Sequence, residues 1–298
     1  MRIVVAGGTG FLGRALGERL RQDGHDVRVL SRRAASPGDI AWSPDGSTGA
    51  WAKALDDADA VVNLAGESIA GGRWTAARKA RIRDSRIRAT RSLVTAIQQA
   101  ARPPAVLLSG SAVGYYGPRG DEPLTEQAPA GDDFLAGVCR DWEAEALRAA
   151  STTRVVLLRT GLVLDKDGGA LPQMALPFKL FGGGPVGSGR QFYSWIHRGD
   201  WVGLVRWALG AGRVSGPLNL TAPNPLPNRE FAKTLGRVLR RPSFMPAPGV
   251  VLRVALGEMA DALLLAGQRV LPAEAQAQGY RFEYPTLEPA LRAIYARR

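Results

Sequence analysis

The sequence predicts an α/β fold in which helices cover both faces of a parallel, doubly wound sheet. Short apolar runs alternate with stretches of helical periodicity over the first 165 residues, and such alternation builds parallel sheets. The runs are almost continuously apolar, as strands buried on both faces must be. A glycine-rich segment joins the first apolar run to the first helical pattern.

The first two predicted strands enclose an amphipathic helix. Residues 3–6 are apolar, residues 11–20 repeat apolar side chains at spacings of three and four, and residues 27–30 form the next apolar run. Gly24 is suited to end the helix between them. This is a β-α-β unit.

The same alternation continues along the chain. We expect strands at 60–64, 105–108 and 154–158, and helices at 75–101 and 133–150. Beyond them the chain becomes rich in glycine and proline, which predicts loops.

The change from alternating apolar runs to a chain rich in glycine and proline predicts a core and a smaller lobe. We assign residues 1–165 to the core, which the segment 192–220 rejoins, and residues 166–191 and 221–298 to the C-terminal lobe. A last helical region is expected at about 250–267.

Composition and charge indicate an ordinary globular protein. The chain has 298 residues, of which 45% are hydrophobic and 22% charged. The net charge of +12 raises the question of nucleic acid. Arg supplies most of it in a chain rich in Ala, Gly and Pro, which indicates codon bias. No zinc spacing or RNA-binding motif accompanies the charge, so we expect no nucleic-acid partner.

Metal and membrane sites are also not expected. Cys139 is the single cysteine, which excludes a cysteine-based metal site, and we interpret His197 as structural. Charges interrupt the apolar stretch 250–266, so we expect no membrane span. The chain starts directly with a strand rather than a signal peptide. We therefore expect a cytoplasmic protein.

The glycine segment has the strongest chemical signal. It follows Gly-x-x-Gly-x-x-Gly between a strand and a helix. Glycine lets the backbone approach a pyrophosphate closely, and the helix N-terminus offers N–H groups to it. This context predicts a Rossmann fold that binds a dinucleotide. The expected contacts come from Gly7, Thr9, Gly10, Phe11, Leu12 and Gly13.

The end of the second strand distinguishes NAD from NADP. An NAD site usually has an acid there for the ribose 2′-OH, whereas this strand ends in Ser31-Arg32-Arg33. Because Arg pairs with a 2′-phosphate, we predict NADP(H), with Ser31 and Arg32 at the phosphate. The alternative is that these are exposed loop arginines.

One arginine of the long helix falls on its apolar face. At 100° per residue, Arg86 lies within the stripe that contains Ile82 and Leu93, whereas Arg81, Arg83, Arg88 and Arg91 lie outside it. A buried Arg needs an anion or other acceptors. We therefore consider Arg86 a substrate-side residue, with a structural ion pair as the alternative.

Longer segments resemble a known family. They include Asn63–Gly66, Ser109–Gly117, Trp195–His197, Gly187–Gln191 and Leu263–Pro272. Together with the glycine segment, they resemble atypical extended short-chain dehydrogenases/reductases, in the epimerase-like subgroup related to nucleoside-diphosphate-sugar epimerases. The resemblance covers essentially the whole chain.

The resemblance implies further site residues. It adds the turn Leu64, Ala65 and Gly66 to the dinucleotide site, and it places a small-molecule substrate between core and lobe. Homodimers are common in that superfamily, and a homodimer stays open here.

Ordinary members of the superfamily use a catalytic Tyr and a Lys four residues later, and this pair is missing. No tyrosine has Lys four residues later, and alignment on Glu143 puts Leu135 and Cys139 at those positions. Ser111 aligns with the superfamily's catalytic serine beyond the fourth strand, and Tyr115 is the nearest phenol that could replace the missing acid. The alternative is that Ser111 caps the strand end and Tyr115 packs under the lobe.

Two functions follow from these patterns. The preferred one is an NADP(H)-dependent, epimerase-like oxidoreductase that acts on a small polar substrate, for example a nucleotide-sugar. The alternative is a non-catalytic NADP(H)-binding sensor or regulatory module, because the Tyr-Lys pair is absent.

Overall fold

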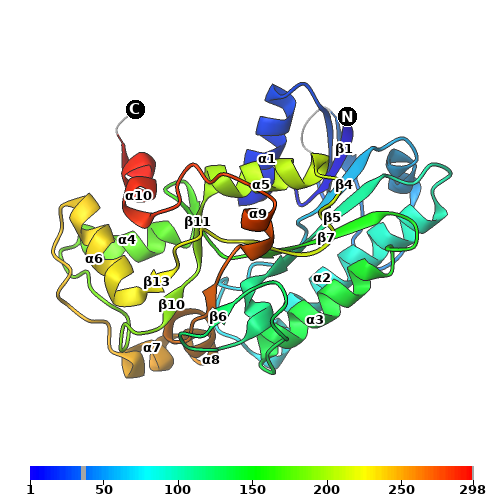
Figure 1. The fold of residues 1–298 in the computed structure, drawn as a ribbon. Helices are drawn as coiled ribbons and strands as arrows, with labels where there is room; N and C mark the ends of the chain where they lie inside the picture. Colours follow the sequence, from blue (N-terminus) through cyan, green and yellow to red (C-terminus); the bar gives the residue numbers. More distant parts are fainter. Residues whose placement is uncertain (35–37, 297–298) are drawn as a thin grey trace.

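A parallel sheet forms the centre of the molecule (Figure 1). The computed structural model describes residues 1–34 and 38–296. Seven strands pair in the order β12-β7-β5-β4-β1-β2-β3, all parallel. The predicted fold class is confirmed. The strands are β1 Arg2–Ala6, β2 Asp26–Ser31, β3 Asp39–Ala41, β4 Ala60–Asn63, β5 Val106–Ala112, β7 Arg154–Thr160 and β12 Gly216–Leu220.

Helices bury both faces of this sheet. Side chains of α1 and α5 pack with Ile3 and Val5 on one face, and side chains of α2 and α3 pack with Val4 and Ala6 on the other. This division follows from the alternation of side chains along a strand. The helices are α1 Phe11–Gln22, α2 Ala76–Gln99, α3 Phe134–Leu147 and α5 Arg198–Gly210.

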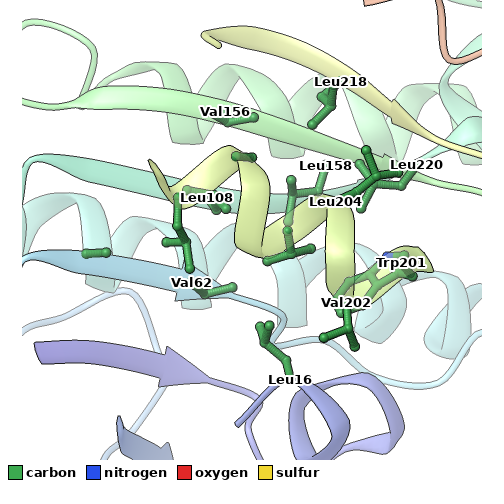
Figure 2. Packing of buried hydrophobic residues seen from close by; sticks show 14 of the residues in the cluster. Leu16, Val62, Leu108, Val156, Leu158, Trp201, Val202, Leu204, Leu218 and Leu220 are labelled. Carbon is green, nitrogen blue, oxygen red and sulfur yellow. The ribbon is translucent and has the colours of Figure 1, made fainter. Parts of the chain in front are cut away.

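Residues of adjacent strands form the core beneath α5. Val62, Leu108 and Val156 come from β4, β5 and β7, and Leu204 of α5 lies over them (Figure 2). All four side chains are fully buried. This packing anchors the segment after residue 192 to the sheet.

The direction in which the strands are added reverses at β1. The chain passes from β1 to β2 on one side, whereas β4 and β5 lie on the other. Ligands of such sheets bind at the carboxyl ends of the strands beside this reversal. The glycine segment follows β1, and the Leu64–Gly66 turn follows β4, so both reach this point.

A smaller group of elements lies beyond the carboxyl ends of the strands (Figure 1). Its core contains Trp195, Phe231 and Leu291. The strands are β8 Leu162–Asp165, β9 Gly168–Gly169 and β11 Trp195–His197 in one sheet, β10 Phe192–Tyr193 with β13 Leu226–Pro227, and β6 Pro123–Leu124 with β14 Arg269–Val270. The helices are α4 Leu171–Lys179, α6 Asn228–Leu239, α7 Gly249–Leu256, α8 Glu258–Ala260, α9 Ala273–Ala277 and α10 Leu287–Tyr295.

Three short helical segments complete the fold. The first, the 3-10 helix Ala50–Leu55, packs on the sheet beside α2. The second, Val113–Tyr116, follows β5, and the third, Asp261–Leu265, is a π-helical segment.

Two sequence expectations need correction. The helical region expected at 250–267 is interrupted at Gly257, whose φ of 65° ends α7. The strand expected at 105–108 extends to Ala112, so Ser111 lies within β5 rather than beyond it. Residues 216–220 do return to the sheet beside β7. The division into core and lobe remains a prediction.

Candidate functional site

The glycine loop is shaped so that only glycine fits its closest contacts. Gly7 has a φ of 78°, and a Cβ there would lie 2.7 Å from the carbonyl of Leu64. A Cβ at Gly13 would overlap the carbonyl oxygen of Gly7 and lie 2.6 Å from the Cα of Gly8. The first turn of α1 therefore lies directly against the loop, as a dinucleotide cradle requires.

The N-terminus of α1 keeps its positive end open. The exposed Gly10 is the N-cap, no side chain caps it, and no acid lies in the first turn. Its N–H groups and dipole remain available to phosphates. The ring of Phe11 packs against Gly168 and Gly169 of β9.

The end of β2 carries an unneutralised arginine. Ser31 Oγ donates to the carbonyl of Arg33 at 2.8 Å and accepts from its N–H, which orders the turn. Arg32 is exposed, and within residues 1–34 and 38–296 no carboxylate forms a salt bridge with it. The geometry suits an anionic group rather than a ribose hydroxyl alone.

Arg86 lies against Gly66 in the turn Leu64–Gly66, which is expected to border the cofactor. A Cβ at Gly66 would lie 3.2 Å from Arg86 Cγ and Cζ. Arg86 Nη1 donates to the carbonyls of Glu67 and Ile82, at 3.0 and 2.8 Å. The guanidinium carbon lies 5.2 Å from the ring centroid of Trp142.

The charge of Arg86 is half-buried. Burial lowers the pKa of its guanidinium, although Arg still stays protonated. Across the described part of the chain, no carboxylate forms a salt bridge with it, and only its Nη1 donates to a protein acceptor. The structural ion pair considered above is therefore not formed. Backbone carbonyls hold its Nη1 instead, and the substrate role of Arg86 remains a prediction.

Arg78 of α2 is 13% exposed at its side chain and pairs with Glu67. The four arginines outside the apolar stripe form an exposed face. Each lies near an acid, and about half of each side chain is exposed: Arg81 with Glu67, Arg83 with Asp141, Arg88 with Asp84, and Arg91 with Glu145. The periodicity therefore separated Arg86 from them correctly.

Ser111 belongs to a buried polar cluster. Its Oγ donates to Glu143 Oε1 at 2.6 Å, and the same carboxylate accepts from Arg159 Nε and Nη2 at 2.9 and 2.8 Å. Arg159 Nη1 also donates to the Tyr116 hydroxyl at 3.0 Å. Ser111 is 4% exposed. Its catalytic role remains a prediction.

Tyr115 stacks against the same cluster. The guanidinium carbon of Arg159 lies 3.5 Å from the centroid of the Tyr115 ring, which meets the Tyr116 ring edge-on. Burial raises the pKa of Tyr116 to about 12, and its hydroxyl donates to Asn219. Tyr115 is half-buried, and its role as an acid also remains a prediction.

The positions of the missing pair lie on α3. Leu135 and Cys139 are one turn apart, and both face Gly114. Burial raises the pKa of the Cys139 thiol to about 12, so it stays protonated and unreactive. Neither side chain can transfer a proton near neutral pH.

The partner of Ser111 was not predicted from the sequence. Glu143 entered only as an alignment position, and Arg159 was not among the predicted site residues. The one available signal was Arg159 itself, a charge at the end of the apolar run Val155–Leu158. A charge in a strand that is buried on both faces needs a buried partner.

Among the described residues, no helix is long and apolar enough to cross a bilayer. Neither do their His, Cys, Asp and Glu side chains gather in a group of three that could hold a metal ion.

Fold and site together define a dinucleotide-binding Rossmann protein. The chain belongs to the NAD dependent epimerase/dehydratase family, whose model matches residues 3–220. Residues 247–294 match a second model, the Domain of unknown function (DUF1731). The resemblance inferred from the sequence is confirmed.

Two relatives match nearly the whole of this chain. The chain is 42% identical to the human Epimerase family protein SDR39U1 over 299 residues, which cover 99% of this chain and 100% of that one. It is 44% identical to the chloroplastic SDR39U1 homolog of Arabidopsis thaliana, covering 99% and 86%.

Solved structures show the same fold. The human SDR39U1 structure with NADPH has a TM-score of 0.92 at 41% identity and covers 99% of both chains. A nucleoside-diphosphate sugar epimerase from Corynebacterium glutamicum has a TM-score of 0.80 at 35% identity, covering 98% of this chain and 57% of that one.

Proposed function

We propose that this protein binds NADP(H) at the carboxyl end of β1 and works as an epimerase-like oxidoreductase on a small molecule. The observation that carries the proposal is the exposed Arg32 at the end of β2, with which no described carboxylate forms a salt bridge, together with the N-terminus of α1, which has no side-chain cap. The human relative described with NADPH supports the same cofactor.

The residues present fit this cofactor. The N–H groups of Gly7 to Gly13 would hold the pyrophosphate, the Leu64–Gly66 turn would border it, and Arg32 would hold the 2′-phosphate. Ser31 orders the turn that presents Arg32. When bound, NADP(H) supplies the hydride chemistry.

Arg86 is the residue we propose for an anionic group of the substrate. Its aliphatic part packs on Gly66, and carbonyls fix Nη1, so the guanidinium is already positioned. Preorganised charges bind anions without a further ordering cost. The sequence analysis expects the substrate to be polar, for example a nucleotide-sugar.

A non-catalytic NADP(H)-binding module is the second candidate. Ser111 donates its hydroxyl hydrogen to Glu143, and α3 carries Leu135 and Cys139 where the catalytic pair would be. These contacts favour a protein that senses cofactor without turning over substrate. Binding of a partner that depends on NADPH, without consumption of the cofactor, would distinguish this function.

The cofactor proposal is tested by calorimetric titration with NADP⁺ and NAD⁺. We expect NADP⁺ to bind at least tenfold more tightly, and Arg32→Ala to remove most of that preference because the lost pairing contributes about 1.5–3 kcal/mol. Arg28→Ala is the matched control, because Arg28 lies on the same strand but pairs with Asp26. Equal affinities in the wild type would overturn the proposal.

The location also stays a proposal. We propose the cytoplasm, although the Arabidopsis relative is named as chloroplastic. Fractionation of the native organism's cells would test this.

A further inference from the structure

An apolar cavity lies in the C-terminal lobe, apart from the glycine loop. Its volume is about 250 Å³, and α4, α6, α7 and the segment 182–193 surround it. Its walls include Met174, Phe178, Phe231, Leu235, Met245 and Leu252. Figure 1 places α4 and α6 away from β1, on the far side of the lobe.

The lining of the cavity selects against a phosphate group. None of its described lining residues carries a charge. A nucleoside diphosphate needs cations or several N–H donors at its phosphates. Moving a phosphate into an uncharged apolar pocket would lose its hydration without compensation. The cavity therefore fits an apolar group.

Polar side chains complete the lining of the cavity. Tyr193, Asn228 and Gln173 line it, and the Asn228 and Gln191 side chains stand near the Tyr193 hydroxyl. Gln191 is 9% exposed and does not itself line the cavity. The Tyr193 hydroxyl and the Asn228 amide can therefore form a hydrogen bond with a polar group of a ligand.

Helix α7 forms a loosely attached wall. None of its residues is buried, although Leu252 lines the cavity. Val250, Val251 and Val254 are 69%, 59% and 72% exposed. An apolar helix without a buried residue has few contacts to hold it closed. Its displacement would open the cavity to solvent.

We propose that this cavity binds the apolar portion of a small alcohol or carbonyl compound. A cavity of 150 Å³ holds benzene, so about 250 Å³ accommodates roughly ten non-hydrogen atoms. The uncharged lining, in which Tyr193, Asn228 and Gln173 are the polar side chains among apolar ones, favours an apolar chain or ring that carries a hydrogen-bonding group. Binding in this cavity goes beyond the proposed function and does not depend on it, because the glycine loop, the Leu64–Gly66 turn and Arg86 do not line the cavity.

The ligand of this cavity therefore differs from the polar substrate proposed for the site beside Arg86. A nucleotide-sugar presents phosphates and many hydroxyl groups, which this cavity cannot pair. A medium-chain alcohol presents one hydroxyl group and an apolar chain, which it can.

Binding of 1-octanol to the full chain tests the proposal. Ligand-detected NMR with saturation transfer would give the dissociation constant, and we expect saturation at one molecule per chain. Ala232→Phe should raise the dissociation constant at least tenfold, because Ala232 is 3% exposed and lines the cavity. Ala247→Leu fills the same cavity from another segment and serves if Ala232→Phe does not fold.

The control removes exposed apolar surface without touching the lining. Phe244 and Val254 are 70% and 72% exposed, so Phe244→Ser with Val254→Ser should leave octanol binding unchanged. Octanol binding that does not saturate, that survives both filled variants, or that is lost in the control would overturn the proposal. Competition by uridine diphosphate would also contradict it.

NADP⁺ titration of the same variants separates the two proposals. The filled variants should bind NADP⁺ like the wild type, because the cavity lies outside the glycine loop. A protein that binds octanol but not NADP⁺ would refute the proposed function and leave the cavity proposal intact.

Discussion

Ser111 donates its hydroxyl hydrogen to Glu143 across 2.6 Å, and the two residues are 4% and 5% exposed. Arg159, itself 4% exposed, forms two hydrogen bonds to the same carboxylate. The three residues join β5, α3 and β7 near the carboxyl ends of the two strands. The hydroxyl that aligns with a catalytic serine is therefore part of the packing that holds one wall of the site.

Removing the carboxylate charge should destabilise the fold. Glu143→Gln keeps the shape of the side chain but leaves the buried Arg159 without a counter-charge. We expect a loss of about 3–5 kcal/mol in the free energy of unfolding, because an uncompensated buried charge is costly. Urea denaturation measures this loss.

Glu145→Gln is the matched control on the same helix. The arginines that pair with Glu145 are 46% and 54% exposed at their side chains, so water compensates them when the pair is broken. We expect a loss below about 1 kcal/mol. Equal losses in the two variants would show that the buried ion pair does not hold this wall.

Two glycines of α1 should respond oppositely to alanine. A Cβ at Gly13 would overlap the Gly7 carbonyl, so Gly13→Ala must push the loop away from the helix. We expect NADP⁺ affinity to fall at least tenfold. At Gly17, one turn later, the nearest atom would be the flexible Arg21 Nη1 at 3.4 Å.

Gly17→Ala should therefore stabilise the protein by roughly 0.5–1 kcal/mol, because alanine loses less entropy in a helix. It should leave NADP⁺ affinity unchanged. Calorimetric titration and thermal unfolding of both variants check the pair. Normal cofactor binding by Gly13→Ala would contradict the assignment of the loop.

His197 should make stability depend on pH. Its Nδ1 accepts from the N–H of Gly199 at the start of α5, and its ring packs on Tyr284 at 4.2 Å. Burial lowers the pKa of His197, and Arg198 lowers it further, while Asp200, Asp165 and Glu283 raise it. The unfolded chain protonates His197 near pH 6.5, whereas the folded chain resists protonation until lower pH.

The contribution of His197 to stability is therefore present above pH 6.5 and lost as pH falls through the lowered pKa. The slope is at most about 1.4 kcal/mol per pH unit. His197→Asn keeps an N-cap acceptor but does not titrate. Thermal unfolding between pH 5 and 7 should show a steeper fall for the wild type, and parallel curves would refute the prediction. Asp200, whose pKa burial raises from 3.8, acts in the opposite direction in both proteins.

The core of the fold was predictable because its signals are local. The apolar run at 3–6 became β1, Arg2–Ala6, and the helix expected at 75–101 became α2, Ala76–Gln99, with Thr75 as its N-cap. By contrast, β3 has three residues, none of them buried, so no apolar run marks it. The break at Gly257 depends on a positive φ, which apolar periodicity does not reveal.

Parts of the candidate site were likewise predictable from the local sequence, and other parts were not. The glycine loop and the end of β2 are continuous segments whose chemistry can be read from adjacent residues. The partner of Ser111 comes from α3 and is fixed by Arg159 of β7, so it follows only from the tertiary structure. Helical periodicity placed Arg86 on the buried face, but the carbonyls that hold it depend on the turn after β4.

Arg86 should be an anion-binding residue that the fold itself does not need. Arg86→Met removes hydrogen bonds to two carbonyls, but it also removes a half-buried charge that forms no salt bridge within the described residues. These effects oppose each other. We expect the free energy of unfolding of the ligand-free protein to change by less than about 1 kcal/mol.

Losing Arg86 should abolish the stabilisation of the protein by a bound anion. With the glycine loop saturated by NADP⁺, inorganic phosphate should raise the melting temperature of the wild type and not that of Arg86→Met, because binding to the native state stabilises it. Arg88→Met is the control: its side chain is 58% exposed and pairs with Asp84, so it should respond like the wild type. A phosphate response that survives in Arg86→Met would assign Arg86 to the packing of α2 against Gly66 alone.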